Sequence, residues 1–341
     1  MELRIYTEHS PEPDEALLRA WASATDADQY DPFCCTPAWQ MAFHEAFLPR
    51  RSLVIAAGDG HAAAFAEGSF DTGLPCLTPL EAHWFSGNPL LGPEPDALFA
   101  TMLGALVRAY QGVLPGFMLS GQKHETLQKI AKHFGKFYHL VRYQTAEQRT
   151  ASLTEGLDGW LARRSGNFRA KLRKADRRAA AQGVGYERHV PCGMEHADEL
   201  YARMLAVEEK SWKGLGHCGM TEAPSRQFYH SMIRRVSQGA QGGVGRVMFA
   251  THEGEDIGFI FGTLACGVYR GQQFSYAQDW RTASIGDLLQ YRQLEWLCEE
   301  GALRYDMGMS DDPRMAYKTH WAEDIRKQEI WLLIPDQSSI S

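Results

Sequence analysis

Apolar residues recur at helical spacing in several parts of the chain. Trp39, Phe43 and Phe47 stand four residues apart and predict a helix over 37–47. Two apolar runs, 51–57 and 61–70, flank a glycine turn and predict a pair of strands. In the first half, the same criteria predict helices over 14–24, 96–110 and 126–134, strands over 116–120 and 138–143, and a loop over 87–95.

The second half of the chain follows a similar order. Its patterns predict helices over 198–213, 225–237 and 284–300, and strands over 245–252, 256–266, 268–278, 303–308 and 329–334. The shared order of helices and strands indicates an α/β (α+β) protein of duplicated architecture, although no repeat of individual residues is visible. A chain of 341 residues also predicts two domains, which we place at 1–150 and 151–341.

Composition narrows the class of protein. An apolar fraction of 44% excludes a disordered chain, and a net charge of −7 argues against a general nucleic-acid or membrane-surface binder. The N-terminal sequence has no basic segment followed by an apolar one, so we expect no secretory signal. The longest apolar run, 257–269, is too short for a membrane-spanning helix. A cytoplasmic location is therefore expected.

The cysteines and histidines give no sign of a metal site. The seven cysteines are scattered and include no Cys-x-x-Cys pair, which favours reduced thiols. The 13 histidines show no metalloprotease spacing. We expect no bound metal.

The most biased segment lies between the two halves. Residues 163–178 hold eight Lys or Arg side chains against one acid, Asp176. Phe168, Leu172 and Ala175 or Ala179 give this segment a thin apolar stripe at helical spacing. Two interpretations stay open: a solvent-facing basic helix, or a surface that contacts a polyphosphate partner.

The stretch 256–318 carries the most chemical information. Ser284 stands at the expected start of a helix, with Asp287 three residues later, a pattern similar to a capping box. The exposed N–H groups of such a helix start attract phosphate or carbonyl oxygen, and Gly286 allows a ligand to approach the backbone. A well-capped helix without a ligand is the alternative.

This stretch resembles the GNAT-type N-acyltransferases, in particular the branch called CelD/BcsL-like or FemAB-like. The segment 281–286 is similar to the acyl-CoA signature Arg/Gln-x-x-Gly-x-Gly/Ala, with Ser284 in place of the first glycine. Further pieces match that branch in order: Thr36-Pro37-Ala38-Trp39, Phe168-Arg169-x-x-Leu172-Arg173, Glu208-x-x-Ser211-Trp212-Lys213-Gly214, Tyr276, Gly301-x-x-x-Tyr305-Asp306-x-Gly308 and Tyr317-Lys318-x-x-Trp321.

The resemblance implies two tandem GNAT-like domains, each with a mixed, mostly antiparallel sheet flanked by helices, the first of them degenerate. It implies an N-acyltransferase that moves an acyl group from acetyl-CoA or another acyl-CoA to an amine acceptor, a small molecule or a peptide, at the cleft between the halves. The residues that it implies for donor binding are Arg281, Ser284, Ile285, Gly286, Arg169 and Arg173.

The resemblance also suggests catalytic residues, each with a structural alternative. Asp306 is the first candidate for the base that accepts the amine proton, unless it caps the Gly308 turn. Glu208 is the second, unless it lies on a solvated helix face. Tyr276 could protonate the leaving group or pack in the core, and Lys318 could contact phosphate or the developing oxyanion.

Two other functions stay open at this point. FemAB-like relatives can use aminoacyl-tRNA as donor, and the basic segment would suit tRNA as well as CoA. Two features argue against an enzyme that transfers amino acids onto a cell-wall precursor: the net charge is negative, and the sequence has no long coiled-coil arm. The other alternative is a non-catalytic RNA- or partner-binding module on a GNAT scaffold.

Overall fold

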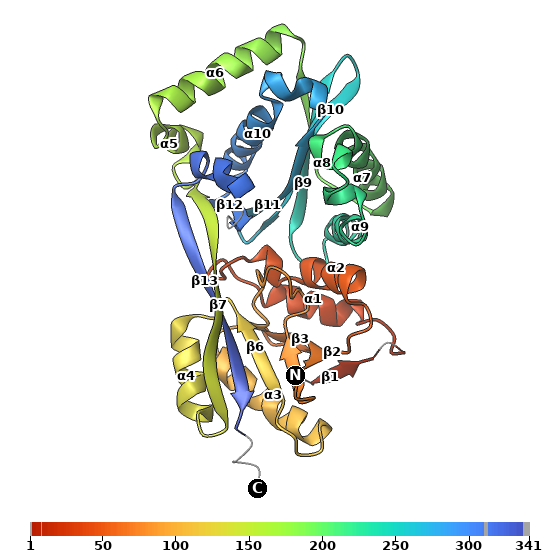
Figure 1. Ribbon diagram of the computed structural model, residues 1–341, viewed down its shortest axis with the longest axis vertical. Coiled ribbons are helices and arrows are strands. Elements are labelled where there is room, and N and C mark those ends of the chain that lie inside the picture. Colours follow the sequence, from red (N-terminus) through yellow and green to blue (C-terminus); the bar gives the residue numbers. More distant parts are fainter. Residues whose placement is uncertain (1, 8, 310–312, 337–341) are drawn as a thin grey trace. The chain divides into compact units, whose positions relative to one another are not determined.

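The computed structural model describes residues 2–7, 9–309 and 313–336 (Figure 1). The chain divides into two compact units. The first contains residues up to 147, residues 240–242 and those from 327 onward, and the second contains 148–239 and 243–326. The C-terminal strand therefore groups with the first unit, whereas the expected domains place it in the second.

The first unit is built on a mixed sheet with the strand order β1-β2-β3-β4-β6-β13. The neighbours in this order are antiparallel except for β4 and β6, which are parallel. Its core includes Val54, Phe65, Phe99, Phe117 and Leu333. The elements are β1 (Arg4–Tyr6), α1 (Glu15–Ser23), α2 (Pro37–Phe47), β2 (Leu53–Gly58), β3 (His61–Ser69), β4 (Pro75–Thr78), β5 (Leu90–Leu91), α3 (Pro95–Ala109), β6 (Gly116–Ser120), α4 (His124–Phe134) and β13 (Asp324–Pro335), with a short 3-10 turn at Phe33–Cys35.

The second unit has the strand order β7-β12-β11-β10-β9-β8, in which only β11 and β12 run parallel. Helix α10 covers one face of these strands, and α7 with α9 covers the other (Figure 1). Strand β7 (Tyr138–Ser152) begins in the first unit, and its residues from 148 onward belong to the second. The other elements are α5 (Gly156–Ala162), α6 (Gly166–Ala181), β8 (Gly185–His189), α7 (Met194–Glu209), α8 (Trp212–Leu215), η2 (Gly219–Thr221), α9 (Ser225–Ser237), β9 (Val244–His252), β10 (Glu255–Ala265), β11 (Val268–Tyr276), η3 (Gln278–Ala283), α10 (Ile285–Glu299), β12 (Arg304–Met309) and η4 (Pro313–His320).

The expected fold class, mixed and mostly antiparallel sheets flanked by helices, is confirmed. Most predicted helices and strands lie within a few residues of the observed ones. The helix expected over 198–213 is an exception, since α7 ends at Glu209 and α8 starts at Trp212. Ser211 causes the break, because its hydroxyl accepts the N–H groups of Lys213 and Gly214 and so begins a new helix. The loop expected over 87–95 contains the short strand β5.

Two irregularities of the second sheet shape the site. Among the described residues, β11 and β12 pair only from Val268 and Arg304 to Arg270 and Asp306, and none pairs with the rest of β11 on that side. The register of β10 and β11 also shifts between Phe261 and Gly262, because Gln272 is an extra residue on β11. Beyond Arg270 the sheet therefore opens along one edge of β11.

No helix among the described residues is long and apolar enough to cross a membrane.

Candidate active site

A pocket of about 670 Å³ lies in the second unit where β11 and β12 separate. The start of α10 forms one end of it, and α8 and η2 form the other. Its walls mix cationic, aromatic and amide side chains. They consist of Lys171, Trp212, Lys213, Cys218, Gly219, Ile260, residues 271–276, Arg281, Ser284, Gly286, Asp287, Gln290, Tyr305, Met307, Met315, Tyr317 and Lys318.

The start of α10 differs from the predicted capping box, and that prediction is wrong. Ser284 has a left-handed backbone (φ +60°), and its side chain makes no capping hydrogen bond. Asp287 instead pairs with Lys171 on α6, with Nζ 2.8 Å from Oδ2. The first intrahelical bond is donated by Leu288 to the Ser284 carbonyl, so the N–H groups of residues 285–287 have no acceptor within the helix.

The left-handed backbone at Ser284 falls where the GNAT signature has its first glycine. Glycine adopts positive φ without steric cost, whereas a serine there carries a modest strain. At position 286 a glycine is needed for a different reason, which is lack of space for a side chain. A Cβ at this position would lie 2.9 Å from Tyr276 Cε1 and 3.2 Å from Phe274 Cε2. The absence of a side chain thus lets α10 and the end of β11 approach each other.

The open edge of β11 presents backbone groups to the pocket. Ala277 donates its N–H across to Ile257 on β10 (2.9 Å). Since hydrogen-bonding direction alternates along an antiparallel strand, the N–H groups of Phe274 and Tyr276 point to the opposite edge, where β12 has separated. Backbone donors of this kind can hold a carbonyl oxygen or an oxyanion.

The structure brings some of the predicted residues together and not others. Tyr276, Lys318, Arg281, Ser284 and Gly286 line the pocket. The side chain of Ile285 is fully buried in the core beneath α10, so only its backbone stands at the helix start. Besides Ile285, four predicted residues do not line the pocket: Asp306, Glu208, Arg169 and Arg173.

Asp306 is held on the other face of β12 from the pocket. Its neighbours Tyr305 and Met307 line the pocket, whereas the Asp306 carboxylate is fully buried beside Arg270, 3.3 Å from Nη1. It also accepts the N–H of Gly308 (2.8 Å), and the Gln148 amide reaches its second oxygen at 3.0 Å. A carboxylate with these partners secures the turn and the strand pairing, so the structure argues against Asp306 as the base.

Glu208 is not on a solvated helix face. Its side chain is fully buried at the end of α7, where it accepts the N–H of Met220 (3.3 Å) and the Ser211 hydroxyl (3.4 Å). Lys213 Nζ lies 3.9 Å from Glu208 Oε1. Burial lowers the pKa of Lys213, and the Glu208 charge opposes that shift. Glu208 therefore reaches the pocket only through Lys213.

Lys318 and Tyr317 come from η4. The ammonium of Lys318 is mostly buried and donates to the Met309 carbonyl. The Tyr317 ring meets Phe274 edge to face, with centroids 5.7 Å apart, and burial raises the pKa of its phenol to about 12. Tyr317 thus stays a neutral hydrogen-bond donor near neutral pH.

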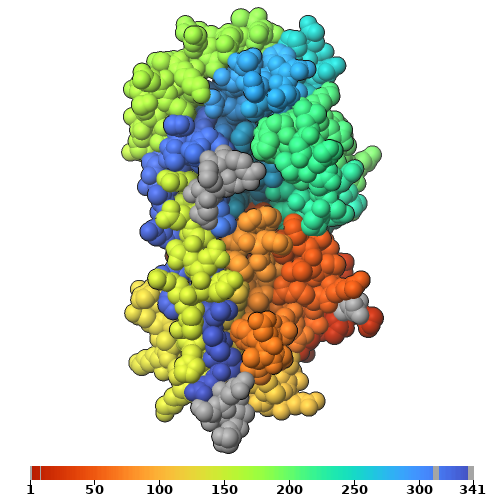
Figure 2. All heavy atoms as spheres, viewed as in Figure 1, coloured from red at the N-terminus to blue at the C-terminus, as the bar shows by residue number. Residues whose placement is uncertain are grey.

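Helix α6 divides its cations between two surfaces. Leu172, Ala175 and Ala179 are buried, as the apolar stripe predicts. On the flank toward α10, Lys171 pairs with Asp287 and Arg178 donates to the Thr282 carbonyl (2.9 Å). Figure 2 shows α6, coloured light green, at the surface of the molecule. Its exposed side carries four cations with no ion pair to any described residue: Arg169, Arg173, Lys174 and Arg177.

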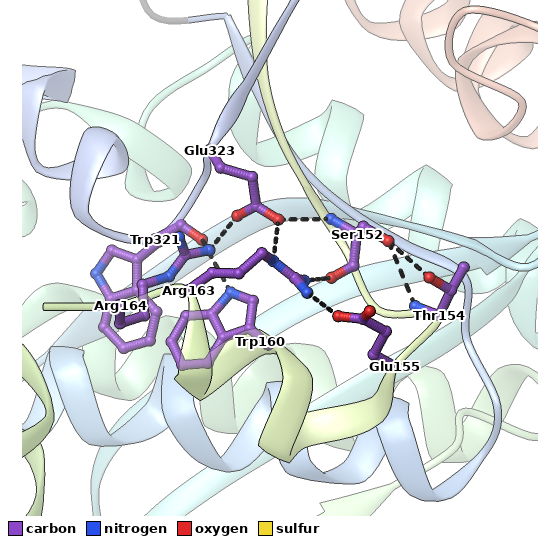
Figure 3. Close-up of polar contacts among 8 residues, drawn as sticks. All are labelled: Ser152, Thr154, Glu155, Trp160, Arg163, Arg164, Trp321 and Glu323. Carbon is purple, nitrogen blue, oxygen red and sulfur yellow. Dashed lines mark hydrogen bonds and ion pairs between the residues drawn. The ribbon is translucent and has the colours of Figure 1, made fainter.

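The first two arginines of the basic segment are structural (Figure 3). Arg163 and Arg164 both pair with Glu323, and Arg163 also bonds Glu155 (2.6 Å) and the Ser152 carbonyl (2.6 Å). Arg164 lies over the Trp160 ring at 4.6 Å and donates to the Trp321 carbonyl. These two cations tie the chain before α6 to the start of β13, and they are not available to a polyphosphate.

Several pocket residues were not predicted as site residues. Lys213 stands inside a motif already quoted, and Lys171 inside the basic segment, so a signal for both was present in the sequence. Cys218, Gln290 and Met307 carry no local signal. They enter the pocket only because β12, α10 and the segment after α8 converge there.

Comparison with known proteins agrees with this geometry. Residues 166–319 match the family model for the acetyltransferase (GNAT) domain. This part of the chain is therefore a GNAT-type acyltransferase domain, and the predicted class of enzyme is confirmed. No curated protein sequence matches the chain significantly.

The fold of the chain is similar to those of several solved structures. It is similar to the crystal structure of FemX, with a TM-score of 0.62, 10% identity, and 96% and 97% of the two chains covered. It is also similar to a conserved protein of unknown function from Bacteroides thetaiotaomicron, with a TM-score of 0.66, 10% identity, and 95% and 98% of the two chains covered. A third similar structure is L-PGS from Bacillus licheniformis, with a TM-score of 0.53, 16% identity, and 89% and 93% of the two chains covered.

Proposed function

We propose that this protein is an N-acyltransferase that moves an acyl group from acetyl-CoA or a similar acyl-CoA to the amine of a small-molecule or peptide acceptor. One observation supports the proposal: a single pocket connects the N–H groups at the start of α10, which have no acceptor within the helix, with the open edge of β11. The first can bind phosphate and the second can bind a thioester carbonyl.

In this proposal the donor lies along the pocket from α10 to β11. The N–H groups of residues 285–287, with Lys171 and Arg281, bind its phosphates. The N–H groups of Phe274 and Tyr276 hold the thioester carbonyl. Lys318, close to the same edge, adds positive charge for the phosphate or for the oxyanion.

The amine nitrogen attacks the thioester carbon, the carbon–sulfur bond breaks, and the thiolate takes a proton from Tyr276 or from water. With Asp306 and Glu208 outside the pocket lining, the amine proton leaves to water in the pocket.

Cys218 offers a direct test of donor binding. It lines the pocket and is partly accessible, whereas Cys192 and Cys266 are exposed elsewhere. We expect saturating acetyl-CoA to slow iodoacetamide labelling of Cys218 about tenfold, with labelling of Cys192 and Cys266 unchanged, as measured by peptide mass spectrometry. Equal labelling of Cys218 with and without acetyl-CoA would remove the acyl-CoA proposal.

A second candidate, aminoacyl transfer from charged tRNA, is favoured by the exposed cations of α6, which lie outside the acyl-CoA pocket. The fold similarity to FemX, and to the C-terminal domain of a putative lysylphosphatidylglycerol synthetase from Agrobacterium fabrum (TM-score 0.52, 14% identity, 82% and 83% covered), is consistent with it. Protection of Cys218 by aminoacyl-tRNA but not by acetyl-CoA would favour this candidate. We retain the cytoplasm as the expected location.

A further inference from the structure

A buried ion pair lies behind the α8 end of the pocket. The Glu208 carboxylate is fully buried, and its only cationic neighbour among the described side chains is Lys213. Gly219 closes over it, because a Cβ at this position would collide with Glu208 Oε1. The carboxylate therefore touches no ligand in the pocket, and its charge acts on Lys213.

Lys213 is in turn hydrogen-bonded to β11. Its Nζ donates to the side-chain oxygen of Gln273 (2.8 Å) and to the backbone carbonyl of Phe274 (2.9 Å). The Phe274 carbonyl belongs to the edge of β11 that β12 has left. The Gln273 amide then donates to the Tyr229 hydroxyl on α9 (2.7 Å), so the contact extends into the helical layer.

We infer that Lys213, held in place by Glu208, is a positioning residue that fixes the open edge of β11. In a closed sheet the neighbouring strand would bond this edge and hold it still. Here the lysine ammonium takes the place of that partner at Phe274, while the neighbouring N–H groups stay available to the pocket. This inference rests on the proposed use of those N–H groups to hold the acyl carbonyl.

A positively charged side chain is needed at position 213 because Glu208 is buried beside it. A neutral donor of the same length would leave Glu208 buried without a counter-charge, and a shorter side chain would not span from the end of α7 to Phe274. Two of the three N–H groups of the ammonium donate to Gln273 and Phe274, and the Glu208 carboxylate lies at ion-pair distance, 3.9 Å from Nζ. Both hydrogen bonds of Lys213 are thus made to β11, and through them the ammonium acts on the strand.

The test replaces the pair together, so that no unpaired charge stays buried. In the double variant Glu208→Gln/Lys213→Met, we expect amide hydrogen exchange over residues 273–277 to be about tenfold faster in the absence of ligand. We expect kcat for acetyl transfer to fall about 10- to 100-fold, with the KM for acetyl-CoA changed less than threefold. The control is Lys210→Met, which removes a neighbouring exposed lysine and should change neither quantity.

Unchanged exchange over 273–277 in a folded double variant would overturn the inference, and so would an unchanged kcat. If the double variant does not fold, Lys213→Arg keeps the charge but cannot place a single donor at Phe274. It should lower kcat at unchanged KM, and full activity would then overturn the inference. If wild-type protein neither binds nor uses acetyl-CoA, the proposed function fails, while the exchange measurement still decides whether Lys213 fixes this edge.

Discussion

Asp306 is a buried charged side chain that lies outside the pocket lining. It is buried against Arg270 and accepts the Gly308 N–H. We expect Asp306→Asn to destabilise the fold by about 3 kcal/mol, because Arg270 would lose its buried counter-charge. The folded variant should retain its turnover, since the side chain does not reach the pocket. Urea unfolding and initial rates on the same sample measure both effects.

Asp176→Asn is the matched control for this prediction. Asp176 also pairs with an arginine, Arg292, but both side chains are partly exposed. Its loss should therefore cost about 1 kcal/mol or less. The opposite pattern for Asp306→Asn, normal stability with a rate about 100-fold lower, would restore Asp306 as the base.

The sequence placed Asp306 in the right strand but could not give its direction. Tyr305 and Met307 line the pocket, and Asp306 between them points to the other face. In a half-exposed strand, alternating polar and apolar residues reveal the two faces. Here Tyr305, Asp306 and Met307 are all buried, because both faces of β12 are covered, so the pattern carries no information on direction.

Gly286 lies against the rings of Tyr276 and Phe274 and leaves no room for a larger side chain. A valine there would push its branched side chain into the rings of Tyr276 and Phe274, at the point where the donor passes from α10 to β11. We expect Gly286→Val to weaken acetyl-CoA binding at least tenfold, as measured by calorimetry. Ser284→Gly serves as the control. It relieves the positive φ at the neighbouring position and should leave binding unchanged.

At the scale of elements, α6 has two basic surfaces with different expected roles. Lys171 lines the pocket, whereas Arg173 lies on the exposed side. We expect Lys171→Gln to weaken acetyl-CoA binding about five- to tenfold and to reduce its salt dependence, because one cation near the donor phosphates is lost. Arg173→Gln should change neither. Titrations at two salt concentrations provide the measurement.

An effect of Arg173→Gln would change the role that we assign to the exposed side of α6. If Arg173→Gln weakened acetyl-CoA binding as much as Lys171→Gln, the donor would extend across the exposed side, as the sequence motif first suggested. If Arg173→Gln affected only the binding of aminoacyl-tRNA, the second candidate function would gain support.

Local patterns predicted elements well and their ends less well. The helices over 37–47 and 225–237 were placed correctly, because apolar residues recur at helical spacing in both. At α10 the serine and aspartate of an apparent capping box are present, but Ser284 is left-handed and Asp287 bonds Lys171. The partner of Asp287 is 116 residues away in sequence, so no local pattern could reveal it.

At the scale of the whole chain, the sequence indicated two halves but not the return of the last strand. β13 pairs with β6, from Ile330 opposite Ser120 to Leu333 opposite Phe117. Which strands become neighbours depends on long-range packing and not on the pattern within either strand. The predicted fragment 1–150 therefore lacks part of the first unit.

The pairing of β13 with β6 predicts that the first unit needs its C-terminal strand in order to fold. Without β13, one edge of β6 loses its partner, and the fully buried Phe117 loses the cover of Leu333. We expect the fragment 1–150 to unfold without a cooperative transition in urea and to bind a dye for exposed apolar surface. The same fragment joined by a flexible linker to residues 324–336 restores the missing strand and should unfold cooperatively. A cooperative transition in the fragment 1–150 alone would show that the first unit folds without its C-terminal strand, and Leu333 would then be peripheral to that core.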